Sequence, residues 1–106
     1  MSNLQITPAA PYTEIASFLK WYPDLQQRAI RTLSYFDNLN LAASVKCRTV
    51  ILNCLCDDIC PPSTIFAAYN HVLAEKQIEV YPFHKHDVPY EHNELKFRLL
   101  MEALRP

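Results

Sequence analysis

Glycine is missing from the sequence: none of the 106 residues is glycine. Globular domains use about 7% glycine, so roughly seven would be expected in a chain of this length. The absence excludes motifs whose backbone depends on glycine: the glycine-rich phosphate loop, the dinucleotide-binding fingerprint and the G-x-S-x-G nucleophile elbow. Tight turns must therefore be built from proline, asparagine and aspartate.

The sequence also has no large excess of positive or negative charge, because its basic and acidic residues nearly balance and give a formal net charge of −1. This balance predicts neither nucleic-acid binding nor a polybasic membrane anchor. No apolar run approaches the roughly 20 residues that span a bilayer, and the first residues show no secretory signal. We therefore expect a cytoplasmic protein, away from membranes, with four reduced cysteines and no disulfide framework.

Alternating helix and strand patterns are what the sequence does contain. Residues 1–10 are a short lead, predicted to be a loose arm. The predicted elements that follow are helices at 12–21 and 24–36, a turn at 37–40, a short helical turn at 41–45, a strand at 47–54, a helix at 63–74, a strand at 77–81 and a helix at 92–104.

The strand–helix–strand order indicates a crossover unit in a parallel sheet. The first strand is continuously apolar in its middle, which is typical of a strand buried on both faces. On the helix between the strands, Val72 and Leu73 are expected to face inward. We predict an α/β fold of two parallel strands with flanking helices. Because two strands bury little surface, we expect self-association or loose packing.

Titratable side chains follow both predicted strands. Asp57 and Asp58 come after the first strand, and His84 and His86 come after the second. Loops at the carboxyl ends of neighbouring parallel strands lie close together, so a carboxylate from one can pair with an imidazole from the other. Ser63, after two prolines, is expected to cap the following helix.

A zinc site is the chemical alternative for this region. Ligand types that zinc accepts occur at Cys54, Cys56, Cys60, His84, His86 and His92. The C-x-C-x3-C spacing is not that of a zinc finger. We therefore predict no metal and no cofactor.

Three blocks of the sequence resemble a known family. They are TLSYFDNLNLA at 32–42, DDICPPSTIFAAYN at 57–70, and VYPF at 80–83 running into His86. On the basis of these blocks, residues 11–106 resemble the C-terminal portion of members of the acetyl xylan esterase and cephalosporin C deacetylase family, which are α/β-hydrolases. The resemblance implies a partial α/β-hydrolase fold and covers about the last third of a family member.

By this resemblance Asp57 matches the acid of a catalytic triad and His86 its base, while Asp58, His84 and His92 do not. The family's serine nucleophile and oxyanion hole lie upstream of the matching portion, and no residue of this chain matches them. Two positions depart from the family pattern, where Cys54 and Lys85 replace glycines.

Two functions follow as hypotheses. The first is the acid- and base-bearing part of a serine esterase that deacetylates sugars or similar small esters, inactive until a complementary hydrolase fragment is present. The second is an inactive remnant that self-associates or binds a partner. The aromatic residues of the first two helices favour a packing surface for another subunit, in keeping with the ring-like oligomers of the family. These residues are Tyr12, Phe18, Trp21, Tyr22, Tyr35 and Phe36.

Overall fold

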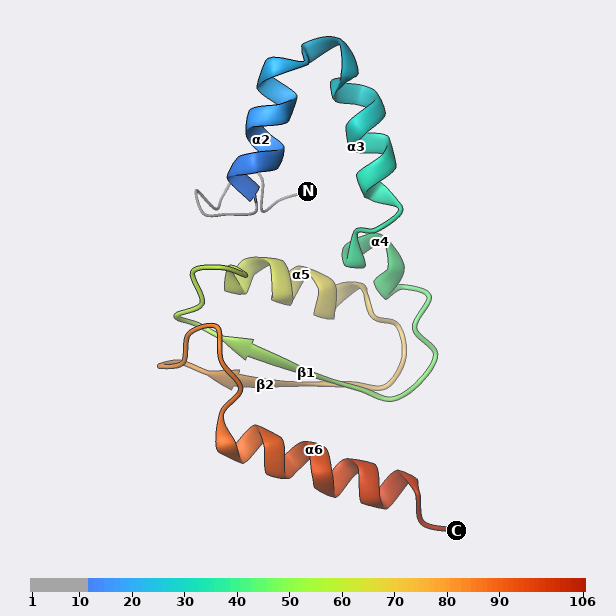
Figure 1. Cartoon of the computed structure of the whole chain (residues 1–106). Helices are drawn as coiled ribbons and strands as arrows, with labels where there is room; N and C mark the ends of the chain where they lie inside the picture. Colours follow the sequence, from blue (N-terminus) through green and yellow to red (C-terminus); the bar gives the residue numbers. More distant parts are fainter. Residues whose placement is uncertain (1–11) are drawn as a thin grey trace.

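The computed structural model describes residues 12–106, which form an α/β fold with a two-stranded sheet (Figure 1). The predicted arm at 1–10 lies outside the described residues. The elements are α2 (Tyr12–Trp21), the 3-10 helix η1 (Pro23–Leu25), α3 (Gln26–Ser34), α4 (Asn38–Ala42), β1 (Thr49–Cys54), α5 (Pro62–His71), β2 (Lys76–Tyr81) and α6 (Tyr90–Ala103).

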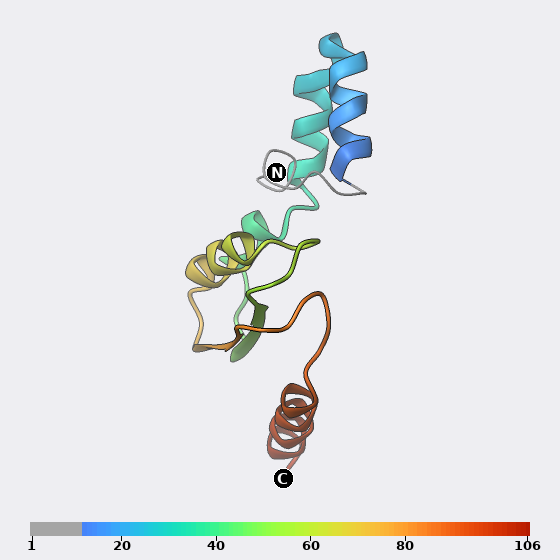
Figure 2. The same ribbon diagram turned by 90° about the vertical axis from the view of Figure 1, so that its left-hand side faces the viewer.

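The sheet confirms the predicted crossover unit. Strands β1 and β2 pair in parallel, from Thr49 opposite Lys76 to Cys54 opposite Tyr81, and α5 connects them. Helix α5 packs on β1, while α6 lies on the other side of the sheet (Figure 2). Only the last two residues of β1 are buried, and the first four are half-exposed. The prediction that this strand is buried on both faces is therefore wrong for the described residues, because α5 packs on β1 whereas α6 does not pack closely on it.

The N-terminal helices differ from the prediction where proline and aspartate act locally. Pro23 keeps Tyr22 out of helical conformation (φ −125°, ψ 68°), so α2 ends and a 3-10 turn precedes α3. The predicted turn at 37–40 is instead the start of α4. The Asp37 carboxylate accepts a hydrogen bond from the Leu39 N–H at 3.0 Å and so caps this short helix.

The ends of α5 also correct the sequence-based expectation. The helix begins at Pro62 after Pro61, with no side-chain cap, so Ser63 does not have the predicted capping role. It ends at His71 because Val72 is extended (φ −68°, ψ 124°). Val72 is buried as predicted, whereas Leu73 is 80% exposed. Both residues lie beyond the end of the helix, so the helical spacing no longer decides which of them faces inward.

The core of the described residues is small. Its buried apolar side chains are Ala42, Cys54, Val72 and Pro89, joined by the buried Asn53 and His92. The radius of gyration is 16.4 Å, against about 13 Å for a compact domain of 100 residues. The extended shape of 54 × 30 × 19 Å agrees with the expected loose packing. None of the helices within residues 12–106 is long and apolar enough to cross a membrane.

Candidate functional site

The loops after β1 and β2 leave the sheet at the same edge. Beyond the last paired residues, the Leu55 N–H donates to the Tyr81 carbonyl at 3.1 Å and the Cys56 N–H donates to the His84 carbonyl at 3.0 Å. The backbone pairing of the strands thus continues into the loops. This is why residues 55–61 and 82–89 lie side by side.

Asp57 and His86 are brought together at this edge. The His86 Nδ1 lies 2.9 Å from the Asp57 Oδ2, across 29 positions of sequence. The other carboxylate oxygen, Oδ1, accepts the backbone N–H groups of Ile59 at 2.9 Å and of Cys60 at 2.8 Å. With the carboxylate accepting at Nδ1, a neutral His86 carries its lone pair on Nε2, the form needed in a general base.

Asp57 is fixed and ionised, while His86 is accessible. The Asp57 side chain is 12% exposed and that of His86 is 52% exposed. Burial acts to raise the pKa of Asp57, but hydrogen bonds from the Cys60 N–H, the His86 ring and the Ile59 N–H outweigh it. The net effect lowers the pKa below its ordinary value. A charged carboxylate therefore persists at neutral pH and stabilises an imidazolium beside it.

Two thiols connect the strand ends to the histidine loop. The buried Cys54 donates its S–H to the Asp87 carbonyl at 3.5 Å, and Cys56 donates to the Pro82 carbonyl at 3.1 Å. Burial, with smaller contributions from the charges of Asp87 and Asp57, raises the pKa of Cys54, so the sulfur stays a protonated donor. Cys54, one of the two departures from the family pattern, thus holds the loop that carries His86.

The other candidate side chains lie in different surroundings. His84 contacts Asp87 instead, with its Nδ1 2.7 Å from Oδ2. His92 is buried on α6, with its Nδ1 3.3 Å from the Tyr81 hydroxyl. Asp58 is exposed. The structure therefore pairs only Asp57 and His86 across the two loops among the described residues, and their roles in catalysis stay predictions.

A cavity of about 250 Å³ adjoins this pair. It is lined by Leu52, Cys54, Asp57, Cys60, Ile65, His86, Asp87 and Val88. An imidazole oriented by a carboxylate and facing a cavity is suited to removing a proton from a hydroxyl group and returning it.

One group of possible metal ligands occurs within residues 12–106: Asp57, Cys60 and His86, whose ligand atoms lie within 4.8 Å of one another. The six-residue set considered from the sequence is not assembled, because Cys54, Cys56, His84 and His92 lie outside this group. Cys60 was one of those six candidates, but its grouping with Asp57 and His86 was not predicted from the sequence. The available signal was its position three residues after Asp57, where its backbone N–H reaches that carboxylate.

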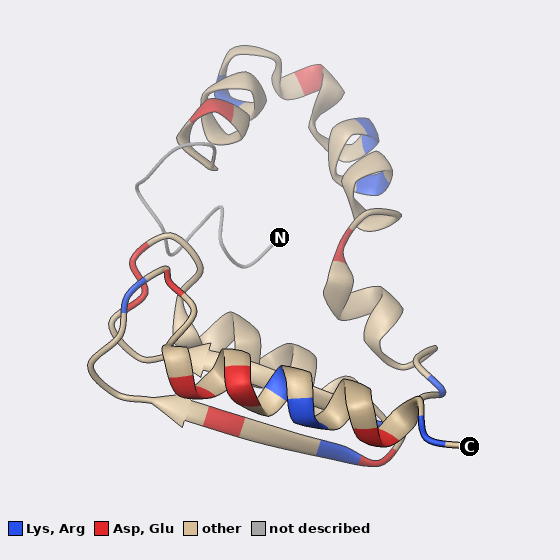
Figure 3. Cartoon of the chain, turned by 60° about the horizontal axis from the view of Figure 1, so that its bottom comes forward, with Lys and Arg blue, Asp and Glu red and all other residues tan. Residues whose placement is uncertain are grey.

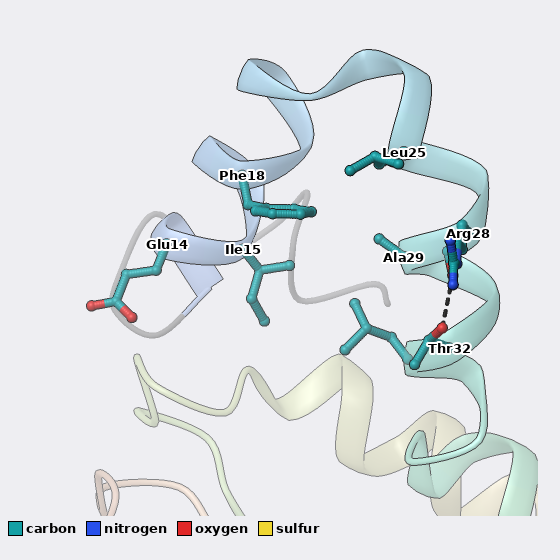
Figure 4. Close-up of a pocket in the computed structure, with 8 residues that line it drawn as sticks. Glu14, Ile15, Phe18, Leu25, Arg28, Ala29 and Thr32 are labelled. Carbon is teal, nitrogen blue, oxygen red and sulfur yellow. Dashed lines mark hydrogen bonds between the residues drawn. The ribbon is translucent and has the colours of Figure 1, made fainter.

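A second, larger cavity lies away from the loops, between α2 and α3 (Figure 4). It has a volume of about 570 Å³ and a mostly apolar lining that includes Ile15, Phe18 and Leu25. Of the aromatic residues predicted to form a packing surface, Phe18 lines this cavity, while Trp21, Tyr35 and Phe36 are exposed. Along α6 in Figure 3, acidic residues lie toward both ends and basic residues lie between them, in keeping with the near-zero net charge.

Comparisons with known proteins agree with the expected resemblance. The family model of acetyl xylan esterase (AXE1) matches residues 3–102. The acetyl esterase Axe7A of Xylanibacter ruminicola is 30% identical over 64 residues, which are 60% of this chain and 15% of that protein.

Two solved structures resemble the fold. The acetyl xylan esterase from Paenibacillus sp. R4 superposes with a TM-score of 0.84 at 38% identity, covering 95% of this chain and 33% of that one. Acetyl xylan esterase 1 from Thermoanaerobacterium sp. JW/SL YS485 gives a TM-score of 0.80 at 31% identity, covering 92% and 32%. The predicted α/β-hydrolase type of fold is confirmed, and the chain spans about a third of these two relatives.

Proposed function

Because the chain belongs to the acetyl xylan esterase family, we propose that Asp57 and His86 are the acid and base of a serine esterase. The proposed reaction is removal of acetyl groups from sugars or similar small esters. The observation that supports it is the 2.9 Å hydrogen bond between the His86 ring and a carboxylate that is itself fixed by two backbone N–H groups.

The proposed step uses each side chain in a distinct way. His86 takes the proton of a serine hydroxyl at Nε2 as the oxygen attacks the acetyl carbonyl. It then gives that proton to the leaving sugar oxygen as the ester C–O bond breaks, which forms the free sugar hydroxyl and an acetyl-serine. Asp57 holds Nδ1 and stabilises the imidazolium that forms between these transfers. A water molecule, activated by His86, then releases acetate from the serine.

The serine must come from a complementary hydrolase portion. The chain spans 33% of its relative from Paenibacillus sp. R4, and no serine in residues 12–106 forms a hydrogen bond with His86. Triad members act as a unit, so the loss of the nucleophile removes nearly all of the catalysis. We therefore expect the isolated chain to hydrolyse activated acetate esters no faster than its His86→Ala variant.

A chimaera tests the proposal directly. Residues 12–106 replace the matching third of the Paenibacillus sp. R4 esterase, and hydrolysis of an acetylated sugar is measured. We expect activity that falls on the order of 10³–10⁴-fold in Asp57→Asn and in His86→Gln. His84→Gln, the matched control from the same loop, should keep most of the activity. An active chimaera that is insensitive to His86→Gln would overturn the proposal.

The exposed apolar surface favours a second candidate function, an interaction module. Large side chains on α2, α3 and α6, including Trp21, Ile30 and Phe97, are exposed in the single chain, and such surface is typical of association sites. In that case the chain forms a stable oligomer that neither has nor supports esterase activity. Sedimentation measurements combined with the chimaera assay separate the two candidates.

A further inference from the structure

Three chemically different ligand groups converge beside the cavity at the sheet edge. The carboxylate of Asp57, the thiol of Cys60 and the imidazole of His86 offer ligand atoms within 4.8 Å of one another. We propose that they form a binding site for a soft divalent cation, with Zn²⁺ as the best match. Carboxylate oxygen, thiolate sulfur and imidazole nitrogen are the three ligand types that zinc accepts.

The spacing requires little movement. Zinc bonds of 2.0–2.3 Å in a tetrahedral arrangement place ligand atoms about 3.3–3.8 Å apart. The Asp57 Oδ2 and the His86 Nδ1, which lie 2.9 Å apart, must separate slightly to bind one ion. The other distances, none above 4.8 Å, shorten by roughly 1 Å at most. Asp57 and Cys60 belong to a single turn that the hydrogen bonds from Ile59 and Cys60 to the carboxylate already hold. Only His86 comes from the neighbouring loop. Hydrogen bonds that orient a ligating carboxylate strengthen metal binding.

The surroundings also suit a bound cation. The adjoining cavity of about 250 Å³ leaves room for a water molecule at the fourth position of the ion. The carboxylate and a thiolate at Cys60 together balance the two positive charges. The sulfur and nitrogen ligands favour zinc over the hard cations Mg²⁺ and Ca²⁺, which take oxygen ligands.

Such a site has a functional consequence for the proposed esterase. A cation held by Asp57 and His86 displaces the proton that these side chains share, so cation binding and general-base catalysis exclude each other. Zinc would then act as a reversible inhibitor that depends on Cys60. The site itself does not rest on the proposed function, because cation binding can be measured on the chain alone.

Zinc binding to the reduced full chain tests the site. Zn²⁺ is titrated in competition with a chromogenic chelator, and we expect one ion per chain. Cys60→Ser and His86→Gln should each weaken binding by about tenfold or more. Cys47→Ser, which removes an exposed thiol outside the ligand group, should leave affinity unchanged, as should a large excess of Mg²⁺.

A second measurement on the unmodified chain avoids any effect of substitution on folding. Alkylation of each cysteine is followed by mass spectrometry with and without Zn²⁺. We expect the ion to slow modification of Cys60 about tenfold, as a metal-bound thiolate is a poor nucleophile, and to leave the exposed Cys47 unaffected. Equal protection of both thiols, no protection of Cys60, or unchanged affinity in Cys60→Ser would each overturn the site.

Discussion

The two ends of the molecule are held together in different ways. At the sheet edge, short hydrogen bonds join residues 55–61 to 82–89, and the Asp57 carboxylate alone makes three of the bonds in this region. At the helical hairpin of α2 and α3, apolar side chains face an open cavity, and no residue of the hairpin is buried. The site is therefore specified by contacts within the chain, whereas the hairpin leaves apolar surface exposed in the single chain.

Among substitutions that test this difference between the sheet edge and the hairpin, Asp57→Ala is expected to have the largest effect on stability. It removes the acceptor of two backbone N–H groups and the partner of the His86 ring. We expect a loss of about 1–2 kcal/mol in the free energy of unfolding. This is comparable to the combined loss of a helix-capping side chain and of one side-chain hydrogen bond. Chemical denaturation of the chain measures it, with Asp58→Ala as the exposed control. Equal effects of the two substitutions would show that the loop contacts do not stabilise the fold.

The contrast also explains what the sequence predicted well. That a carboxylate of one loop would meet an imidazole of the other followed from two strand patterns and the rule that parallel strands end at one edge. The crossover helix and both strands were identified for the same reason, since each has a local pattern. The choice of Asp57 and His86 among the candidates came from the resemblance to the esterase family. What failed was set by single backbone positions: the extended Val72 ended α5 early, and the Asp37 side chain started α4.

The position of Cys60 beside Asp57 and His86 was also not predicted from the sequence. Its closeness to His86 depends on how the turn after Asp57 folds, and that turn is held by backbone N–H groups that every residue type carries. The burial of the first strand was overestimated. An apolar run indicates that a strand has two faces to bury, but it does not indicate whether other parts of the chain cover both faces.

A smaller effect is expected from pH. The pKa of Asp57 is lowered in the folded chain from its ordinary value of 3.8, so the unfolded state binds its proton more readily. The stabilisation is fully present above the ordinary pKa and is lost as the pH falls through the lower, folded value. Denaturation midpoints measured from neutral pH down to about pH 3 should therefore decline less steeply in Asp57→Asn than in the parent chain. Asp58→Asn should keep the parental slope, and a parental slope in Asp57→Asn would contradict the proposed stabilisation.

The smallest effect is expected at the hairpin, from Trp21→Ser. Trp21 is 79% exposed at the end of α2, and substitutions at exposed positions usually change stability by no more than about 0.5 kcal/mol. The same change removes a large apolar side chain from the surface, so it should lower any tendency of the chain to associate while leaving the loops around Asp57 intact. Sedimentation at several concentrations, together with denaturation, measures both quantities. A loss of stability near that of Asp57→Ala would mean that Trp21 is buried in solution by a second copy, and the hairpin would then be as firmly held as the sheet edge.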